Sequence, residues 1–253
     1  MGDNASNSTK KQVHYKSQGL FNGGVMMVVL HKEDIQIFDH YVAIQTASPM
    51  KVVSSAMHNP GFGYYKHVVN RSVPYTYDER QPHQELQHFL QSAGFPAEDT
   101  VAMMTAVYAC YATIREFTYE GIHLVIMITA GLGNAVDITR AFHRQEQYHA
   151  GTINTWVLIN GKLSDEALFQ AMISTTEAKV KALIDENITD PTTGTQATGT
   201  STDSLLIAST EEGDYHQYAG PITMLGKVIG HGVYETMREA IQKYKKDKEE
   251  NQL

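Results

Sequence analysis

The stretch SDEALFQAMISTTEAKVKALIDE, residues 164–186, gives the clearest indication of how this chain folds. Ser164 is placed to cap a helix, and two acidic residues follow it where the helix dipole favours anions. The apolar residues of the stretch spread widely around the helix axis, which predicts burial on more than one side. Apolar segments typical of buried strands flank it, TINTWVLIN at 152–160 and SLLIAS at 204–209. We therefore expect a long helix packed against a sheet.

The remainder of the chain adds more strands than helices. Short segments rich in β-branched residues predict a strand meander at 25–31, 34–39, 42–46, 51–55 and 64–73. Apolar runs without alternation predict buried strands at 100–107 and 124–131, and the segment between these two strands is ambiguous. Apolar residues at helical spacing, with Gly94 behind them, predict a helix over 82–94, and a last helix is expected over 224–246.

Runs of strands followed by alternating units indicate an α+β protein. We expect a single domain with a mixed, largely buried β-sheet covered by helices, and a three-layer α/β arrangement is the alternative. The expected divisions are a disordered tail at 1–12, the domain at 13–246 and a charged tail at 247–253.

Composition restricts the class of protein. The 253 residues carry a formal net charge of −8, which opposes binding to a nucleic-acid backbone. The single cysteine, Cys110, cannot form an internal disulfide, and its apolar context VYACYA predicts a core position. The N-terminus has no signal-peptide core, and the longest apolar run is about half of what a bilayer requires. These features predict a cytoplasmic protein without a membrane span.

No motif predicts a protein-bound metal. Neither HExxH nor CxxC occurs, and the twelve histidines follow no zinc-ligand spacing.

Small polar residues gather where four apolar elements begin or end. The segments are TAGLGNA (129–135), GTINT (151–155), STTEAK (174–179) and ATGTSTDS (197–204). Glycine lets a backbone approach a ligand closely, and ligands often bind where loops meet beyond strand ends. One such turn is weak support, whereas four together predict a small-molecule pocket.

Two carboxylates are candidate functional groups. Glu177 shares a helical stripe with Ile173 and Val180, and a carboxylate buried on such a stripe can serve as a general acid or base. A structural ion pair with Lys179, Lys181 or another cation is the alternative. Asp203 ends a hydroxyl-rich loop, where it either serves the ligand or only accepts backbone N–H bonds in a turn.

Several blocks resemble the signature of a known family, the CbiZ adenosylcobinamide amidohydrolases. They are, in order, TAGLGNAVD, GTINTWVLIN, TTEAKVKAL, ATGTSTDSLLIAST and YAGPITMLGKVIGHGV, with VVSSA, VVNRSV and AMMTAV upstream. The resemblance covers roughly residues 25 to 242. It implies hydrolysis of the amide that joins adenosylcobyric acid to aminopropanol or its phosphate, a step of corrinoid salvage. The substrate is then an adenosylated corrinoid whose cobalt belongs to the substrate, so no cofactor is expected.

This reaction needs no catalytic metal, because positioning, acid–base chemistry and oxyanion donors together supply a sufficient reduction of the barrier. Our hypothesis is attack by water, with Glu177 or Asp203 as the base and the Asn134 amide among the oxyanion donors. An acyl-enzyme formed by Thr200, Ser201 or Thr202 is the alternative.

The expected substrate-binding residues come from the same loops and from one further turn. They are Gly131, Gly133, Asn154, Thr198, Gly199, Thr200, Ser201, Thr202, His58 and Asn59. The last two stand in MHNPGFG, where the family pattern has a glycine-rich turn, so the pocket is expected to differ there.

A non-catalytic corrinoid-binding module is the alternative to an enzyme. The resemblance also allows coupling to a corrinoid importer. The sequence leaves the oligomeric state open, a homo-oligomer included.

Overall fold

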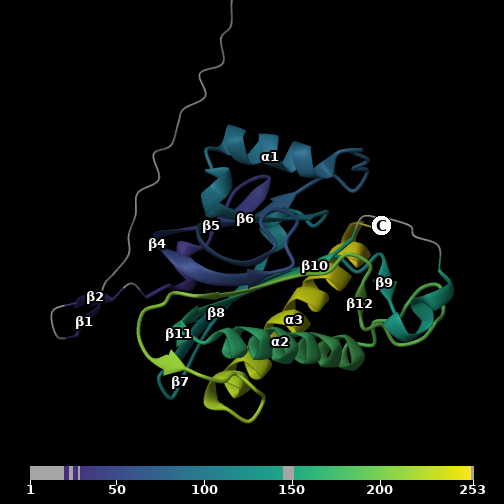
Figure 1. Cartoon of the computed structure of the whole chain (residues 1–253). Helices are drawn as coiled ribbons and strands as arrows, with labels where there is room; N and C mark the ends of the chain where they lie inside the picture. The colour runs from purple at the N-terminus through teal and green to yellow at the C-terminus, as the bar shows by residue number, and fades with distance from the viewer. Residues whose placement is uncertain (1–19, 23–24, 28, 145–150, 252–253) are drawn as a thin grey trace, which may run out of the picture.

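A computed structural model describes residues 20–22, 25–27, 29–144 and 151–251. Its centre is an eight-stranded sheet of order β6-β5-β4-β13-β10-β8-β7, with β3 paired to β4 beside this path (Figure 1). The strands are β3 (Gln36–Ile37), β4 (Tyr41–Ser54), β5 (Gly61–Ser72), β6 (Thr100–Thr105), β7 (Thr113–Tyr119), β8 (Ile122–Ala130), β10 (Ile153–Asn160) and β13 (Ser204–Ser209). The pairs β10–β13 and β5–β6 are parallel and the other pairs antiparallel. The predicted α+β domain with a mixed sheet is confirmed.

Helices and short strand pairs complete the described part of the chain. The helices are α1 (Pro82–Ala93), α2 (Asp165–Asp185) and α3 (Met224–Asn251). The short pairs are β1 (Leu20–Asn22) with β2 (Val25–Met27), β9 (Ala135–Val136) with β12 (Gly199–Thr200), and β11 (Lys162–Leu163) with β14 (Tyr215–His216). The short 3₁₀ helices are η1 (Lys32–Asp34), η2 (Ala97–Asp99), η3 (Ala109–Tyr111) and η4 (Ile138–His143).

The sheet folds back on itself at β4, where the register with β5 shifts between Gln45 and Met50. Such irregularities let one strand take part in two packed sheet layers. One hydrophobic cluster therefore joins Val68 and Met103, from β5 and β6, to Met127 and Trp156, from β8 and β10. The result is a sandwich of two sheet layers. The apolar side chains on the outer face of each layer must then be buried by other elements.

Helices cover both outer faces. Helices α2 and α3 pack on the layer that contains β8, β10 and β13, and α1 packs on β4, β5 and β6 at the opposite side (Figure 1). The predicted helix ends are close to the observed ones. The Ser164 hydroxyl accepts the Ala167 N–H at 3.0 Å as the N-cap of α2, and Gly94 ends α1 in the left-handed conformation with φ 84°.

Some sequence-based expectations are wrong. The two strands expected at 42–46 and 51–55 are one strand, β4, because the polar break between them is the bulge at the corner. Cys110 is exposed and not in the core, since it lies on the 3₁₀ turn η3 with only its neighbours Ala109 and Ala112 buried. Helix α3 continues to Asn251, beyond the expected end at 246.

The expected N-terminal tail at 1–12 lies outside the described residues, as does part of the strand expected at 25–31. No helix within the described ranges combines the length and apolar character needed to cross a bilayer.

Candidate functional site

Most of the predicted site residues meet at one edge of the sandwich. There β8 ends at Ala130, β10 begins at Ile153 and β13 begins at Ser204, and the register places these strand ends side by side. The loops before and after them carry Gly131 to Asn134, and Thr198 to Asp203. In Figure 1 the β9–β12 pair, formed by these loops, lies beyond one end of β10.

Asn134 links three of the loop segments. Its Nδ2 atom donates to the Gly151 carbonyl at 2.7 Å and to the Ser201 hydroxyl at 2.7 Å. The Thr202 hydroxyl donates to the same Gly151 carbonyl at 2.9 Å. Asn134 is buried, whereas Ser201 and Thr202 are exposed. The arrangement therefore holds a solvent-facing hydroxyl against a fixed amide donor, a combination that acyl-transfer sites use.

Asp203 is held by four donors. Its Oδ1 accepts the Ile153 N–H at 3.2 Å, the Thr200 N–H at 3.1 Å and the Thr200 hydroxyl. Its Oδ2 accepts from the Lys179 ammonium group. With four donors bound to its two oxygens, Asp203 has little remaining capacity to accept a hydrogen bond from an attacking water.

Lys179 is the residue that the sequence reasoning missed as part of the site. It was considered only as an ion-pair partner for Glu177. In the structure it joins the TTEAK segment of α2 to the TGTSTDS loop. Its side chain is 15% exposed, so the ammonium group remains within reach of the solvent side of the loop.

Two glycines lie in tightly packed surroundings. A Cβ on Gly199 would lie 2.5 Å from Asp203 Oδ2 and 3.0 Å from Lys179 Nζ, so a side chain there would displace the ends of the ion pair. A Cβ on Gly131 would lie 3.0 Å from the Val107 side chain and 3.2 Å from the Thr152 backbone nitrogen. We expect these glycines to let a ligand approach the backbone closely. In the structure, the space beside each glycine is occupied by other groups of the protein.

The remaining loop residues predicted to bind substrate have structural contacts. The Thr198 N–H donates to the Val136 carbonyl at 2.9 Å, and its hydroxyl accepts the Ile138 N–H at 3.1 Å. Gly133 is exposed in the same turn as Asn134.

Asn154 lies between the two sheet layers. It is fully buried, and its Nδ2 donates to Asn70 Oδ1 at 2.7 Å and to the Met104 carbonyl at 2.8 Å. Asn70 in turn donates to the Thr129 hydroxyl at 3.0 Å. The structure therefore gives Asn154 a place in the core, with structural contacts to both sheet layers.

The loops rest on a frame of buried aspartates. The Asp190 side chain accepts from the Asp137 N–H, the Thr192 N–H and the Arg144 guanidinium group. Burial by itself raises the pKa of Asp190, but these donors outweigh it and lower the pKa to about 2. Hydrogen bonds from Thr195 and Thr139 likewise lower the pKa of Asp137. Both groups are anions at neutral pH and hold the ends of the loops.

Glu177 does not share the site with Asp203. It lies two residues before Lys179 on α2, about 200° away around the helix. The expectation that it is buried is wrong: it is exposed, together with Ile173 and Ile184. It lines a hollow of about 480 Å³ between α2 and α3, with Lys181, Lys227 and His231 among its neighbours.

The turn with His58 and Asn59 is tied to β6 and η2. The His58 backbone pairs with Ala102, and its Nε2 lies 2.9 Å from the Ala97 carbonyl. Asn59 Nδ2 donates to the carbonyls of Ala97 and Thr100, each at 2.8 Å. These contacts are structural, and they account for both polar side chains in the departure from the family pattern.

A profile of the adenosylcobinamide amidohydrolases matches residues 26–249, nearly the whole chain. The chain belongs to the CbiZ family. An adenosylcobinamide amidohydrolase of Methanosarcina mazei is 26% identical over 193 residues, which are 73% of this chain and 86% of that protein. An uncharacterized ABC transporter ATP-binding protein of Bacillus subtilis is 23% identical over 201 residues, which are 79% of this chain but 36% of that protein.

Among solved structures, a beta-aminopeptidase of Burkholderia sp. aligns with 82% of this chain and 80% of its own, at 10% identity and a TM-score of 0.40.

Proposed function

We propose that this CbiZ protein hydrolyses the aminopropanol amide of adenosylcobinamide to give adenosylcobyric acid, and so serves corrinoid salvage. The family supports an amidohydrolase acting on this class of substrate. One contact supports placing the hydrolytic site at this edge of the sheet. Asn134 Nδ2 lies 2.7 Å from the exposed Ser201 hydroxyl. This contact joins two signature loops at a point where a substrate amide has access.

We favour Ser201 as the nucleophile over water activated by a carboxylate. Glu177 faces away, and both oxygens of Asp203 already accept hydrogen bonds. In this mechanism the Ser201 oxygen attacks the amide carbon, the C–N bond breaks, and the hydroxyl proton leaves on the aminopropanol nitrogen. Water then cleaves the ester, which releases the free acid and restores the hydroxyl.

The magnitudes are sufficient for this chemistry. Positioning of the amide contributes roughly 7–11 kcal/mol, and one fixed oxyanion donor about 3–4 kcal/mol. The Asn134 amide nitrogen lies 2.7 Å from the attacking oxygen and is therefore placed beside the carbon at which the oxyanion develops. Their sum lies within the range of about 8–23 kcal/mol that enzymes provide.

The test is mass analysis of adenosylcobinamide after incubation with the protein. We expect loss of aminopropanol and gain of a free acid, with a covalent acyl adduct on the protein at early times. Ser201→Ala should lower turnover by roughly 10³-fold or more, as removal of a nucleophile does in other hydrolases. Ser92→Ala, the same change at an exposed position on α1, should leave turnover unchanged.

Two outcomes would redirect the assignment. Ser201→Ala with turnover near that of the parent chain would exclude the acyl-enzyme and favour water attack beside Asp203. An unchanged corrinoid that stays bound to the protein would favour the non-catalytic binding module.

Coupling to a corrinoid importer is a further proposal. It is supported by the Bacillus subtilis relative, in which the matched region is part of a longer ABC transporter ATP-binding protein. Co-purification with the ATP-binding subunit of an importer would support the coupling.

A further inference from the structure

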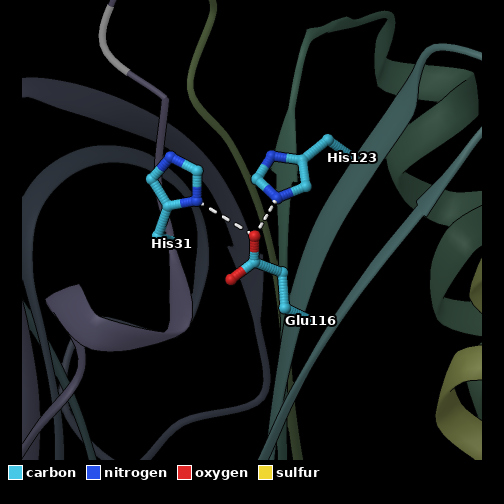
Figure 2. A group of neighbouring side chains, drawn as sticks. All are labelled: His31, Glu116 and His123. Carbon is cyan, nitrogen blue, oxygen red and sulfur yellow. Dashed lines mark hydrogen bonds and ion pairs between the residues drawn. The ribbon is translucent and has the colours of Figure 1, made fainter. Parts of the chain in front are cut away.

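Two histidines and a glutamate meet at the opposite end of β10 from the Ser201 loop. His31 precedes the turn η1, Glu116 lies in β7 and His123 in β8, as Figure 2 shows. His31 Nδ1 is 3.0 Å and His123 Nε2 is 2.6 Å from the same oxygen, Glu116 Oε1. These three atoms all lie within 4.8 Å of one another.

The surroundings define the charge and orientation of this cluster. The Lys32 N–H donates to Glu116 Oε2 at 3.0 Å. Burial by itself raises the pKa of Glu116, but this bond and those from the two histidines lower it to about 2. An ionised carboxylate oxygen therefore faces two imidazole nitrogens, and all three side chains remain partly exposed.

Asn160 fixes the proton of His123. The Asn160 Oδ1 accepts the Leu30 N–H at 2.7 Å, and its Nδ2 donates to the Leu30 carbonyl at 2.9 Å, so the amide has one orientation. The same Nδ2 faces His123 Nδ1 at 2.6 Å. His123 Nδ1 must then accept, and Nε2 carries the proton that it donates to Glu116 in the neutral ring.

We propose that His31, Glu116 and His123 form a binding site for one divalent transition metal of the zinc class. Two imidazoles and one carboxylate are a ligand set that zinc accepts, with an open position for water. In the structure, both imidazole nitrogens contact the Glu116 oxygen directly, at the place where the metal would bind.

Metal binding requires a defined rearrangement. Zinc–ligand bonds of about 2.0–2.1 Å place neighbouring ligand atoms roughly 3.3 Å apart, so the side chains must separate by several tenths of an ångström. Each ring moves its proton to the nitrogen that does not bind the metal, with no net proton release from neutral rings. His123 Nδ1–H then needs an acceptor, so the Asn160 amide must turn and release Leu30. Metal uptake is thereby coupled to the segment that carries His31.

The site is separate from the proposed hydrolytic site. Asn160 lies six residues after Asn154 along β10, a separation of roughly 20 Å at the usual strand rise. The metal would connect the segment before β3 to the β7–β8 edge, and it would take no part in amide hydrolysis.

The test is calorimetric titration of the full chain with ZnCl₂. We expect one zinc per chain, and His123→Ala and Glu116→Gln should each weaken binding by at least tenfold. His88→Ala, which removes an exposed histidine on α1, should leave the isotherm unchanged. An absence of zinc uptake, or an isotherm that His123→Ala does not alter, would overturn the proposal.

A second variant and a spectroscopic measurement keep the test independent of folding defects. Asn160→Asp supplies a carboxylate acceptor for His123 Nδ1–H and should tighten zinc binding by roughly tenfold. Nitrogen NMR of the histidine rings should show the His123 proton move from Nε2 to Nδ1 when zinc is added. An Nε2 proton that persists at saturating zinc would contradict the site.

Discussion

Gly199 is the residue at which the geometry of the loop is most sensitive. A Cβ there would approach Asp203 Oδ2 to 2.5 Å and Lys179 Nζ to 3.0 Å. Gly199→Ala must therefore displace the ends of the Asp203 and Lys179 side chains, and so disturb the ion pair that holds the turn carrying Ser201. We expect turnover to fall by at least tenfold, because small displacements of a reacting group have large effects on rate. Steady-state kinetics with adenosylcobinamide, beside a circular dichroism spectrum, measures this effect.

Gly230→Ala is the matched control. Gly230 lies in α3, and an added Cβ would meet no atom within 4 Å. This change should leave turnover intact and favour the helix by about 1 kcal/mol. Equal turnover in both variants would show that the Lys179–Asp203 pair does not position the site.

At the scale of the element, α2 presents different chemistry on different faces. Lys179 reaches the loop, and Glu177 faces the hollow beside α3. We therefore expect Glu177→Gln to keep turnover within about twofold of the parent chain, whereas general-base removal would cost roughly 10²–10⁴-fold. Lys179→Met should lower turnover by at least tenfold, with partial recovery in Lys179→Arg. A large loss in Glu177→Gln alone would restore Glu177 as the base.

Helix α2 also shows which structural features can be predicted from the sequence. The cap at Ser164 and the length of the helix followed from local chemistry, so they were predicted correctly. The orientation of Glu177 was not, because the apolar residues of α2 spread around the axis and give no single buried stripe. The partner of Lys179 lies 24 residues further along the chain, and only the crossover from β10 to β13 brings it close. The two layers of the sheet could not be predicted from the sequence either, because the bulge in β4 resembles a break between two strands.

At the scale of the molecule, the two sheet layers are joined by few buried polar contacts, and Asn154 makes two of them. Its removal in Asn154→Ala would leave Asn70 Oδ1 and the Met104 carbonyl without this donor in the interior. Each such loss costs about 1–3 kcal/mol, so we expect the free energy of unfolding to fall by roughly 2–6 kcal/mol. The corresponding decrease in Tm is about 4–12 °C for a chain of this size.

A double-mutant cycle separates this role from substrate binding. Because Asn70 and Asn154 bond each other, Asn70→Ala combined with Asn154→Ala should cost less than the sum of the single changes. Denaturant unfolding of the four proteins measures the coupling, and KM for adenosylcobinamide should stay near the parent value in each folded variant. The opposite pattern, a raised KM with unchanged stability in Asn154→Ala, would mean that Asn154 contacts the corrinoid. The layers would then have to part at this edge to admit it.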